Sequence, residues 1–220
     1  MEKQLIWEKT GVLPDTQMKN RFTLIGSALK MFPIGNNVAR LRLGTISSYT
    51  DDHVCYPSIV FYGKDAIDAL KQLDFEKKPR IIVEGFIQTE KKNIDGENKY
   101  FQDLVGLKVS FAKTRLEAAF NMEGIGVAKA APLNEILLSG EVVHIHRFRN
   151  GRFSITIRSE HHNVYNFPTF FCSRSYSDVC ESIKIGDKII AACEVYTYNE
   201  ENGQSFPTRE RIYAKDIQKM

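Results

Sequence analysis

Apolar and polar residues alternate along a short segment around residue 41. Ala39, Leu41 and Leu43 share one parity, whereas Arg40 and Arg42 share the other. Because side chains of a strand point to opposite faces in turn, this pattern predicts a β-strand with one buried face and one cationic face in contact with solvent.

The same alternation returns in the second half of the chain. Phe153, Ile155 and Ile157 share one parity, and Arg152 and Arg158 belong to the other. The residues differ from those of the first segment, but the pattern is the same. It predicts an equivalent strand with one buried face.

Each half of the chain contains three predicted strands, a helix, and two further strands joined by a turn. The helices follow from apolar residues that recur every three or four positions. The turns, Asp95-Gly96 and Asn202-Gly203, are strong hairpin signals. The expected elements lie at 22–25, 38–45, 59–62, 66–73 (helix), 80–89 and 99–111, and then at 134–140, 152–158, 167–172, 176–183 (helix), 188–198 and 205–217.

The two halves are repeats of one unit with a period of about 110 residues. The stretch 20–26 returns at 134–140, and the stretch 56–61 returns at 167–172. Five strands with one helix between the third and the fourth is the order of an OB-fold barrel. We therefore expect an all-β protein with two tandem OB-fold five-stranded barrels and one short helix in each. The expected divisions are an N-terminal extension (1–19), a first domain (20–116), a linker (117–132) and a second domain (133–220).

Composition excludes several classes of protein. Of the 220 residues, 43% are hydrophobic and 26% are charged, which is ordinary for a folded soluble protein. No apolar run has the length of a membrane span or of a signal peptide, so we expect a cytoplasmic protein with no membrane contact. The four cysteines form no CxxC pair, and we interpret them as small buried hydrophobes. No catalytic motif stands out, so we expect no enzyme activity, no metal and no cofactor.

The first unit resembles the bacterial single-stranded DNA-binding proteins (SSBs). The resemblance covers residues 20 to about 111 and rests on the stretches Leu24-Ile25-Gly26, Val38-Ala39-Arg40-Leu41-Arg42-Leu43-Gly44-Thr45, Ile59-Val60-Phe61-Tyr62-Gly63-Lys64 and Ile82-Val83-Glu84-Gly85. It implies that DNA bases stack on three aromatic positions, which match Tyr49, Tyr56 and Tyr62. A fourth stacking position of the family aligns near Lys92 and is not aromatic, although Lys91 and Lys92 could hold phosphate there. Tandem barrels resemble two-domain bacterial SSBs and phage or plasmid SSB-like proteins, which implies a role in DNA replication or recombination.

Strand parity supports a stacking role for two of these tyrosines. If Ile59 and Phe61 face inward, Tyr56, Ser58 and Tyr62 face outward on one surface. Stacking contributes on the order of 1–3 kcal/mol per base and tolerates any base. The alternative is that these aromatic residues belong to the core, as most strand aromatics do.

Basic residues near the tyrosines are candidates for phosphate contacts. Arg40 and Arg42 lie on the strand next to them, where they could also form an ordinary solvated face. In the second unit, Ser173 replaces Tyr62 and the hairpin carries Glu200 and Glu201, so we expect the first barrel to carry more of the affinity. The full set of candidate DNA contacts is Arg40, Arg42, Tyr49, Tyr56, Tyr62, Lys64, Lys91, Lys92, Arg152, Arg158, Phe167, Tyr196 and Tyr198.

These observations favour a protein that binds single-stranded DNA without sequence preference. A protein-interaction or scaffold module and a single-stranded RNA binder remain alternatives.

Ile6 and Trp7 form an apolar hook in the N-terminal extension, which either ties one chain to another, giving a dimer with four barrels, or folds back on its own barrel. The acidic tail by which many SSBs recruit replication enzymes is missing, so we expect no partner by that route.

Overall fold

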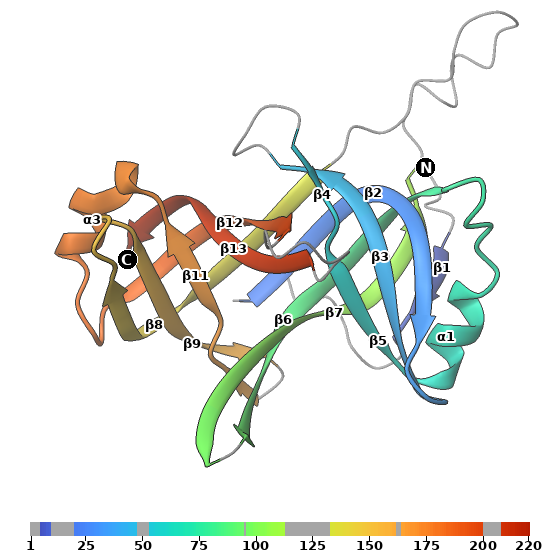
Figure 1. The fold of residues 1–220 in the computed structure, drawn as a ribbon, viewed down its shortest axis with the longest axis horizontal. Helices are drawn as coiled ribbons and strands as arrows, with labels where there is room; N and C mark the ends of the chain where they lie inside the picture. The colour runs from blue at the N-terminus through green and yellow to red at the C-terminus, as the bar shows by residue number, and fades with distance from the viewer. Residues whose placement is uncertain are drawn as a thin grey trace, which may run out of the picture.

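The computed structural model describes residues 5–9, 20–47, 53–94, 96–112, 133–161, 164–199 and 208–220. Figure 1 shows two β-barrels side by side, with the N-terminal half of the chain on the right and the C-terminal half on the left. Strands account for most of the described residues, and each half contains one short helical segment. The predicted fold class is confirmed.

The first barrel closes through five strands. They are β2 (Asn20–Pro33), β3 (Val38–Ile46), β5 (Ser58–Tyr62), β6 (Arg80–Ile94) and β7 (Glu97–Phe111). β2 pairs with β3, β3 with β5, β5 with β7, β7 with β6, and β6 with β2, and only the β5–β7 pairing is parallel. The helix α1 (Lys64–Leu70) follows β5, and the short strand β4 (Val54–Cys55) pairs with β3.

The second barrel repeats this topology. Its strands are β8 (Leu133–Arg147), β9 (Phe153–His161), β11 (Thr169–Cys172), β12 (Lys188–Asn199) and β13 (Thr208–Lys219). They pair in the same cyclic order, again with one parallel pairing, between β11 and β13. A 3-10 turn, η1 (Arg174–Tyr176), and the helix α3 (Ser177–Ser182) follow β11, and β10 (Val164–Asn166) pairs with β9.

Alternation places the core as the sequence predicts. Leu41 and Leu43 of β3 and Ile155 and Ile157 of β9 are fully buried. All four cysteines are free and buried, which confirms their interpretation as small hydrophobes. Contact with Cys180 and burial raise the pKa of the Cys172 thiol.

A glycine in the first strand of each barrel lets the backbone of that strand lie very close to the backbone of the second strand. A Cβ atom on Gly26 would lie 2.2 Å from the carbonyl oxygen of Gly44, and one on Gly140 would lie 2.2 Å from that of Arg158. No side chain fits at either place. The repeated stretches 20–26 and 134–140 therefore both end in glycine for the same steric reason.

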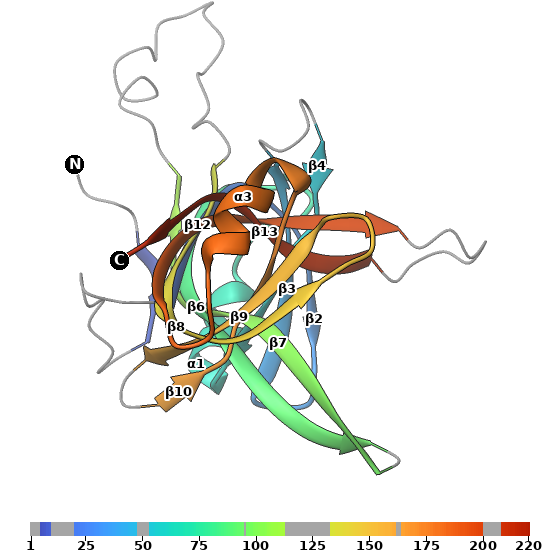
Figure 2. The same cartoon turned by 90° about the vertical axis from the view of Figure 1, so that its left-hand side faces the viewer.

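The two barrels join through their first strands. β2 and β8 pair in antiparallel fashion, and Phe22 lies opposite Ile136 at the centre of the pairing. On either side, the Asn20 side chain bonds the carbonyl and the N–H of Ile87, and the Asn134 side chain bonds those of Val195, all at 2.7–2.9 Å. The halves are thus related by an approximate two-fold axis, and Figure 2 shows the joined barrels from a second direction.

The N-terminal hook folds back on its own barrel. β1 (Leu5–Glu8) pairs with β7, and Trp7 is buried edge-on against Phe61, with ring centroids 5.7 Å apart. The indole N–H donates to Asp65 at 2.9 Å, and this hydrogen bond lowers the pKa of that carboxyl group. Of the two roles expected for Ile6 and Trp7, the structure shows the fold-back on the chain's own barrel, which already buries the indole ring.

Candidate nucleic-acid interface

Two exposed tyrosines lie at β5: Tyr62 is its last residue, and Tyr56 precedes its first residue by two positions. Tyr56 is 41% exposed and Tyr62 is 38% exposed, as a stacking role requires. Ser58, between them, is buried, because Glu210 of β13 lies over it and accepts a hydrogen bond from its backbone N–H at 2.7 Å. The expectation that Ser58 faces solvent is wrong: parity gives the correct face of the strand, but the second barrel covers the middle of it.

Tyr62 lies in a cluster of charged side chains. Arg40 forms an ion pair with Asp103 at 3.1 Å, and both side chains remain substantially exposed. Partial burial and the carboxylates of Asp103 and Glu90 raise the pKa of the Tyr62 hydroxyl, while Arg40 and Lys92 oppose this effect. The phenol ring therefore has cations from β3 and β6 nearby, which is the combination that a stacked base and its phosphates need.

Arg42 occupies a different environment from Arg40. Its side chain is half-buried, its Nε atom is buried, and it lies close enough to Glu210 to stabilise the charged form of that carboxyl. The structure thus places Arg42 at the contact between barrels. Lys64 begins α1 and is exposed.

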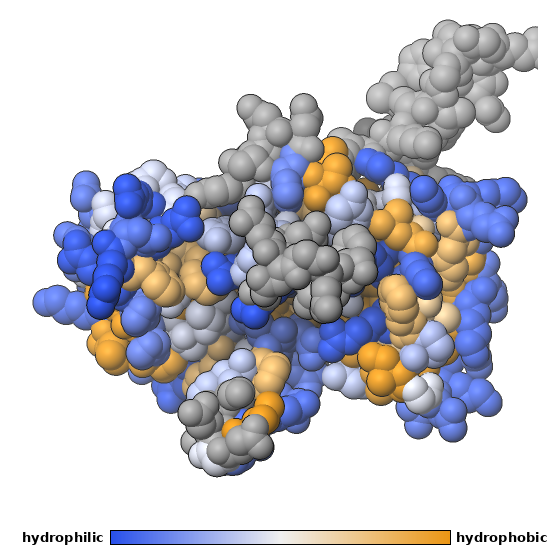
Figure 3. All heavy atoms as spheres, in the orientation of Figure 1, coloured by the Kyte–Doolittle hydropathy of each residue, from blue (hydrophilic) through white to orange (hydrophobic). Residues whose placement is uncertain are grey.

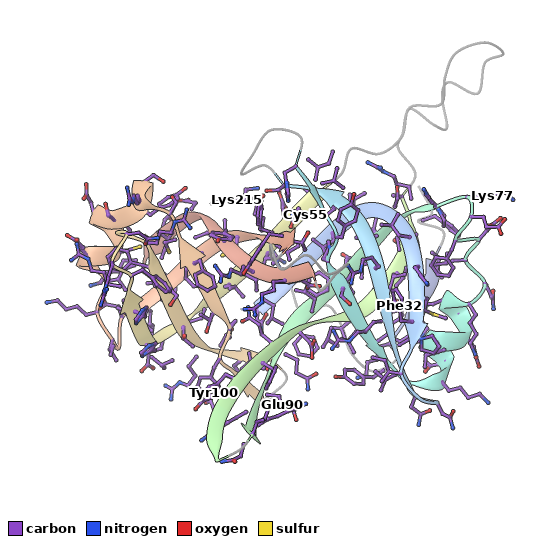
Figure 4. The ribbon with its side chains drawn as sticks, viewed as in Figure 1. Phe32, Cys55, Lys77, Glu90, Tyr100 and Lys215 are labelled. Carbon is purple, nitrogen blue, oxygen red and sulfur yellow. The ribbon has the colours of Figure 1, made fainter. Side chains whose placement is uncertain are left out.

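The hairpin of β6 and β7, here called the first hairpin, carries Lys91 and Lys92 well outside the barrel. Both are exposed, and Lys92 pairs with Glu90 at 2.9 Å. The Lys91 and Lys92 ammonium groups lie 5.9 and 5.6 Å from the ring centroids of Tyr100 and Phe101. Figure 4 shows Tyr100 and Glu90 on this projecting hairpin.

Tyr100 and Phe101 are aromatic residues that sequence reasoning missed. They are 69% and 42% exposed, and cross-strand pairing places Tyr100 opposite Lys91. The Asp95-Gly96 turn carried the necessary signal, because counting outward from it predicts this register. The family position near Lys92 is not aromatic, yet the other arm of the hairpin supplies two rings.

The second barrel carries a row of aromatic rings from three separate strands and from the turn that follows β8. Phe148 lies 6.1 Å from Phe171, Phe171 lies 5.8 Å from Tyr213, and Tyr213 lies 5.8 Å from Tyr196, measured between ring centroids. Tyr196 in turn stacks on His53 of the first barrel, at 4.4 Å. We call Phe148, Phe171, Tyr213 and Tyr196 the aromatic row.

An arginine is held over this row. The Arg211 guanidinium lies 4.9 Å from the ring centroid of Phe171 and 5.0 Å from that of Tyr198. Alternation along β13 puts Arg209, Arg211 and Tyr213 on one face. This face combines two cations with an aromatic ring, and sequence reasoning named none of the three.

The predicted contacts of the second barrel are more scattered. Arg158 pairs with Glu141 at 2.6 Å and lies over the exposed ring of Tyr165. Arg152 is exposed just before β9, and Phe167 is 40% exposed. Tyr196 and Tyr198 are half-buried within the arrangement described above. The remaining candidate, Tyr49, lies outside the described residues.

Each barrel places its last hairpin on the third strand of the other. β12 and β13, the second hairpin, reach β5, where Thr197 Oγ1 accepts from the N–H of Tyr56 at 2.8 Å. The first hairpin reaches the strand β11, and Thr89 Oγ1 accepts from the N–H of Phe167, also at 2.8 Å. In Figure 1, the first hairpin extends away from its own barrel and ends below the strands of the second. Each hairpin thus joins the face of its own barrel to that of the other, near Tyr56 and near Phe167.

Within the described ranges, no group of three or more His, Cys, Asp or Glu side chains could hold a metal ion. Among these same residues, no helix has the length and apolar content that a membrane crossing requires. Figure 3 shows that the visible face mixes polar with apolar residues over both barrels.

Comparison with known proteins identifies the fold. No protein-family model matches the sequence, and no curated protein matches it. The crystal structure of the wild-type single-stranded DNA-binding protein from Thermus aquaticus is similar, with a TM-score of 0.61 and 17% identity over 91% of this chain and 92% of that chain. A deletion mutant of the same protein gives a TM-score of 0.62 at 17% identity, over 91% of this chain and 94% of that one. The match spans both barrels, so the fold that the SSB resemblance implies is confirmed.

Proposed function

We propose that this chain, which has the fold of the Thermus aquaticus SSB, binds single-stranded DNA without reading its sequence. The observation that carries the proposal is Tyr62, an exposed ring with Arg40 and Lys92 beside it. A ring of this kind offers a stacking platform to any base, and the two cations can neutralise phosphates on either side of it.

The two faces joined by the hairpins suggest a path for the strand. Tyr62 on β5 and Tyr56 just before this strand provide the first platform, and the first hairpin adds Lys91, Lys92, Tyr100 and Phe101. The aromatic row and Arg211 extend the same chemistry over the second barrel. A strand that followed these residues would touch both barrels. Binding would then rest on phosphate charge and ring stacking rather than on the edges of bases.

The finer parts of the proposal follow from the tandem fold. We propose domains at 20–116 and 133–220, a binding protein without enzymatic activity, and a cytoplasmic role in replication or recombination, in the manner of phage or plasmid SSB-like proteins. A dimer of two chains, with four barrels, is part of this proposal. It would not depend on the N-terminal hook, and light scattering would measure its mass.

Fluorescence anisotropy with oligo-dT, oligo-U and duplex DNA, at two salt concentrations, tests the proposed function. We expect tight binding to oligo-dT, weak binding to duplex DNA, and weaker binding as salt rises. Arg40→Gln should lower the affinity, whereas Lys77→Gln, whose side chain is 83% exposed on a distant loop, should not. Equal affinity for duplex and single strands would refute stacking, and preference for oligo-U would support the RNA alternative. An affinity independent of salt would support a protein-interaction module.

A further inference from the structure

Each hairpin binds the third strand of the other barrel with one side chain, which is an amide in one contact and a carboxyl group in the other. Gln102 of the first hairpin makes the contact on the second barrel. Its Oε1 atom accepts from the N–H of Thr169 at 3.0 Å, and its Nε2 atom donates to the carbonyl oxygen of Thr169 at 3.2 Å. An amide can do both because it carries an acceptor and a donor side by side. Gln102 therefore satisfies both backbone groups of one residue.

Glu210 of the second hairpin makes the equivalent contact on the first barrel. Its Oε1 atom accepts the N–H of Ser58 at 2.7 Å, in the same way that Gln102 accepts that of Thr169. An ionised carboxylate has no hydrogen to donate, so it can make only this half of the contact. A protonated carboxyl group, in contrast, has an acceptor and a donor in the arrangement of an amide.

The surroundings of Glu210 favour the protonated form. Gln102, Glu210 and Asp103 line a small pocket of about 30 Å³ on the approximate two-fold axis, together with apolar residues that include Ile87 and Val195. Burial raises the pKa of Glu210 to about 7, and Asp103 of β7 adds to this effect. The hydrogen bond from the Ser58 N–H, and then Arg42 and Arg40 of β3, lower this pKa but do not cancel the effect of burial.

Other titratable groups lie near this contact. His53, which precedes β4, contacts the carbonyl oxygen of Thr197 through Nε2 at 2.9 Å, and Thr197 lies opposite Glu210 in the second hairpin. The Cys55 thiol also contacts Thr197, and the buried Glu194 of β12 accepts a hydrogen bond from Ser47 of the first barrel. A pH effect at the contact has to be assigned among these groups and Glu210. Substitution of Glu210 alone makes that assignment, because it leaves His53 in place.

We propose that Glu210 takes up a proton from solvent when the second hairpin packs on β5, and that its protonated carboxyl then holds Ser58 as Gln102 holds Thr169. The contact between the barrels is then weakened by deprotonation. A folded-state pKa above the usual 4.5 means that the stabilisation is complete below pH 4.5 and is lost as pH rises through about 7. Because Ser58 lies between Tyr56 and Tyr62, the loosening occurs inside the proposed DNA surface.

Carbon-13 NMR of the full chain with labelled glutamate tests this directly. We expect one glutamate carboxyl signal to titrate near pH 7, and we expect this signal to vanish in Glu210→Gln. The shift corresponds to a rise in proton affinity on the order of a hundredfold. The proposal fails if every glutamate titrates near pH 4.5, or if the late signal survives in Glu210→Gln. This measurement needs no DNA, so its outcome is independent of the proposed function.

The equivalent residue supplies a matched control. Gln102→Glu places an acid at the other contact, and it should add a pH-dependent loss of thermal stability that the parent protein lacks. Glu210→Gln should do the reverse, with a melting temperature that rises relative to the parent as pH increases from 5 to 8. If Glu210→Gln follows the parent at every pH, or if Gln102→Glu is equally stable at pH 5 and pH 8, a proton at this contact has no role.

Discussion

The two barrels share their framework and differ in the charges on their outer faces. In both, an asparagine at the start of the first strand bonds the backbone of the fourth, and a threonine in the hairpin bonds the backbone of the other barrel two residues before its third strand. The positions that follow Gln102 and Glu210 are Asp103 and Arg211, which carry opposite charges. Contacts to backbone groups tolerate many neighbouring sequences, so the framework is kept while the exposed faces differ.

This difference gives each barrel its own way of placing a cation. In the first barrel, Arg40 projects from β3 and is oriented by the carboxylate of Asp103. In the second, Ser154 and Thr156 occupy the matching outer positions of β9, and the cation is Arg211 of β13, held between aromatic rings. A cation is present on both faces, but it comes from a different strand in each.

The shared centre of the molecule should give the largest effect. Phe22 is almost fully buried where β2 meets β8, and Phe22→Ala should lower the free energy of unfolding by about 3–5 kcal/mol. Chemical denaturation of the full chain measures this. Phe101→Ala, which removes an exposed ring, should change stability little. A loss below 1 kcal/mol for Phe22→Ala would mean that the centre does not hold the barrels together.

The paired asparagines test whether the two halves are equivalent in energy as well as in geometry. Asn20→Ala and Asn134→Ala each leave a buried N–H and a buried carbonyl without their partner. We expect each to reduce the free energy of unfolding by about 1–3 kcal/mol, and the two losses to be similar. Unequal losses would show that the approximate symmetry is geometric only.

Ring removal compares the DNA affinity of the two faces. Tyr62→Ala should weaken oligo-dT binding by roughly 5- to 150-fold, the range for loss of one stacked base. Phe171→Ala in the second barrel should weaken it less, and Ser173→Ala, at the position equivalent to Tyr62, should leave it unchanged. A larger effect of Phe171→Ala in the anisotropy titration would move the main site to the second barrel.

Salt dependence gives the smallest effect and compares the two cations. Each phosphate contact contributes about 0.7 to the slope of log affinity against log salt concentration for single strands. Arg211→Gln and Arg40→Gln should each reduce the slope by about that amount, while Lys77→Gln should not alter it. An unchanged slope for Arg211→Gln would restrict that residue to packing against Phe171 and Tyr198.

Sequence alternation predicted the barrels because it reports on burial strand by strand. Ala39, Leu41 and Leu43 have the inner parity in the sequence and are fully buried in the structure. Helix spacing after Tyr62 likewise predicted α1, although the helix ends at Leu70 and Leu73 follows it. These features depend on residues within a few positions of each other, where pattern and structure agree.

The surface was harder to predict, because parity does not show what covers a face. Ser58 has the outer parity but is buried under Glu210, which is distant in sequence and arrives from the other barrel. The aromatic row was missed for a related reason: Phe148, Phe171 and Tyr213 become neighbours only when the second barrel closes. Trp7 has no partner pattern in the sequence at all, and only the pairing of β1 with β7 explains its burial.

The small pocket between the barrels shows what covalent fusion permits. Gln102 and Glu210 line it from opposite sides of the approximate axis. In a dimer of identical chains, an acid at this place would occur twice, and two like charges would face one another across the axis. A mutation there would also change two contacts at once. Joining both halves in one chain lets a single codon place one acid opposite one amide, which no symmetric pair of subunits can do.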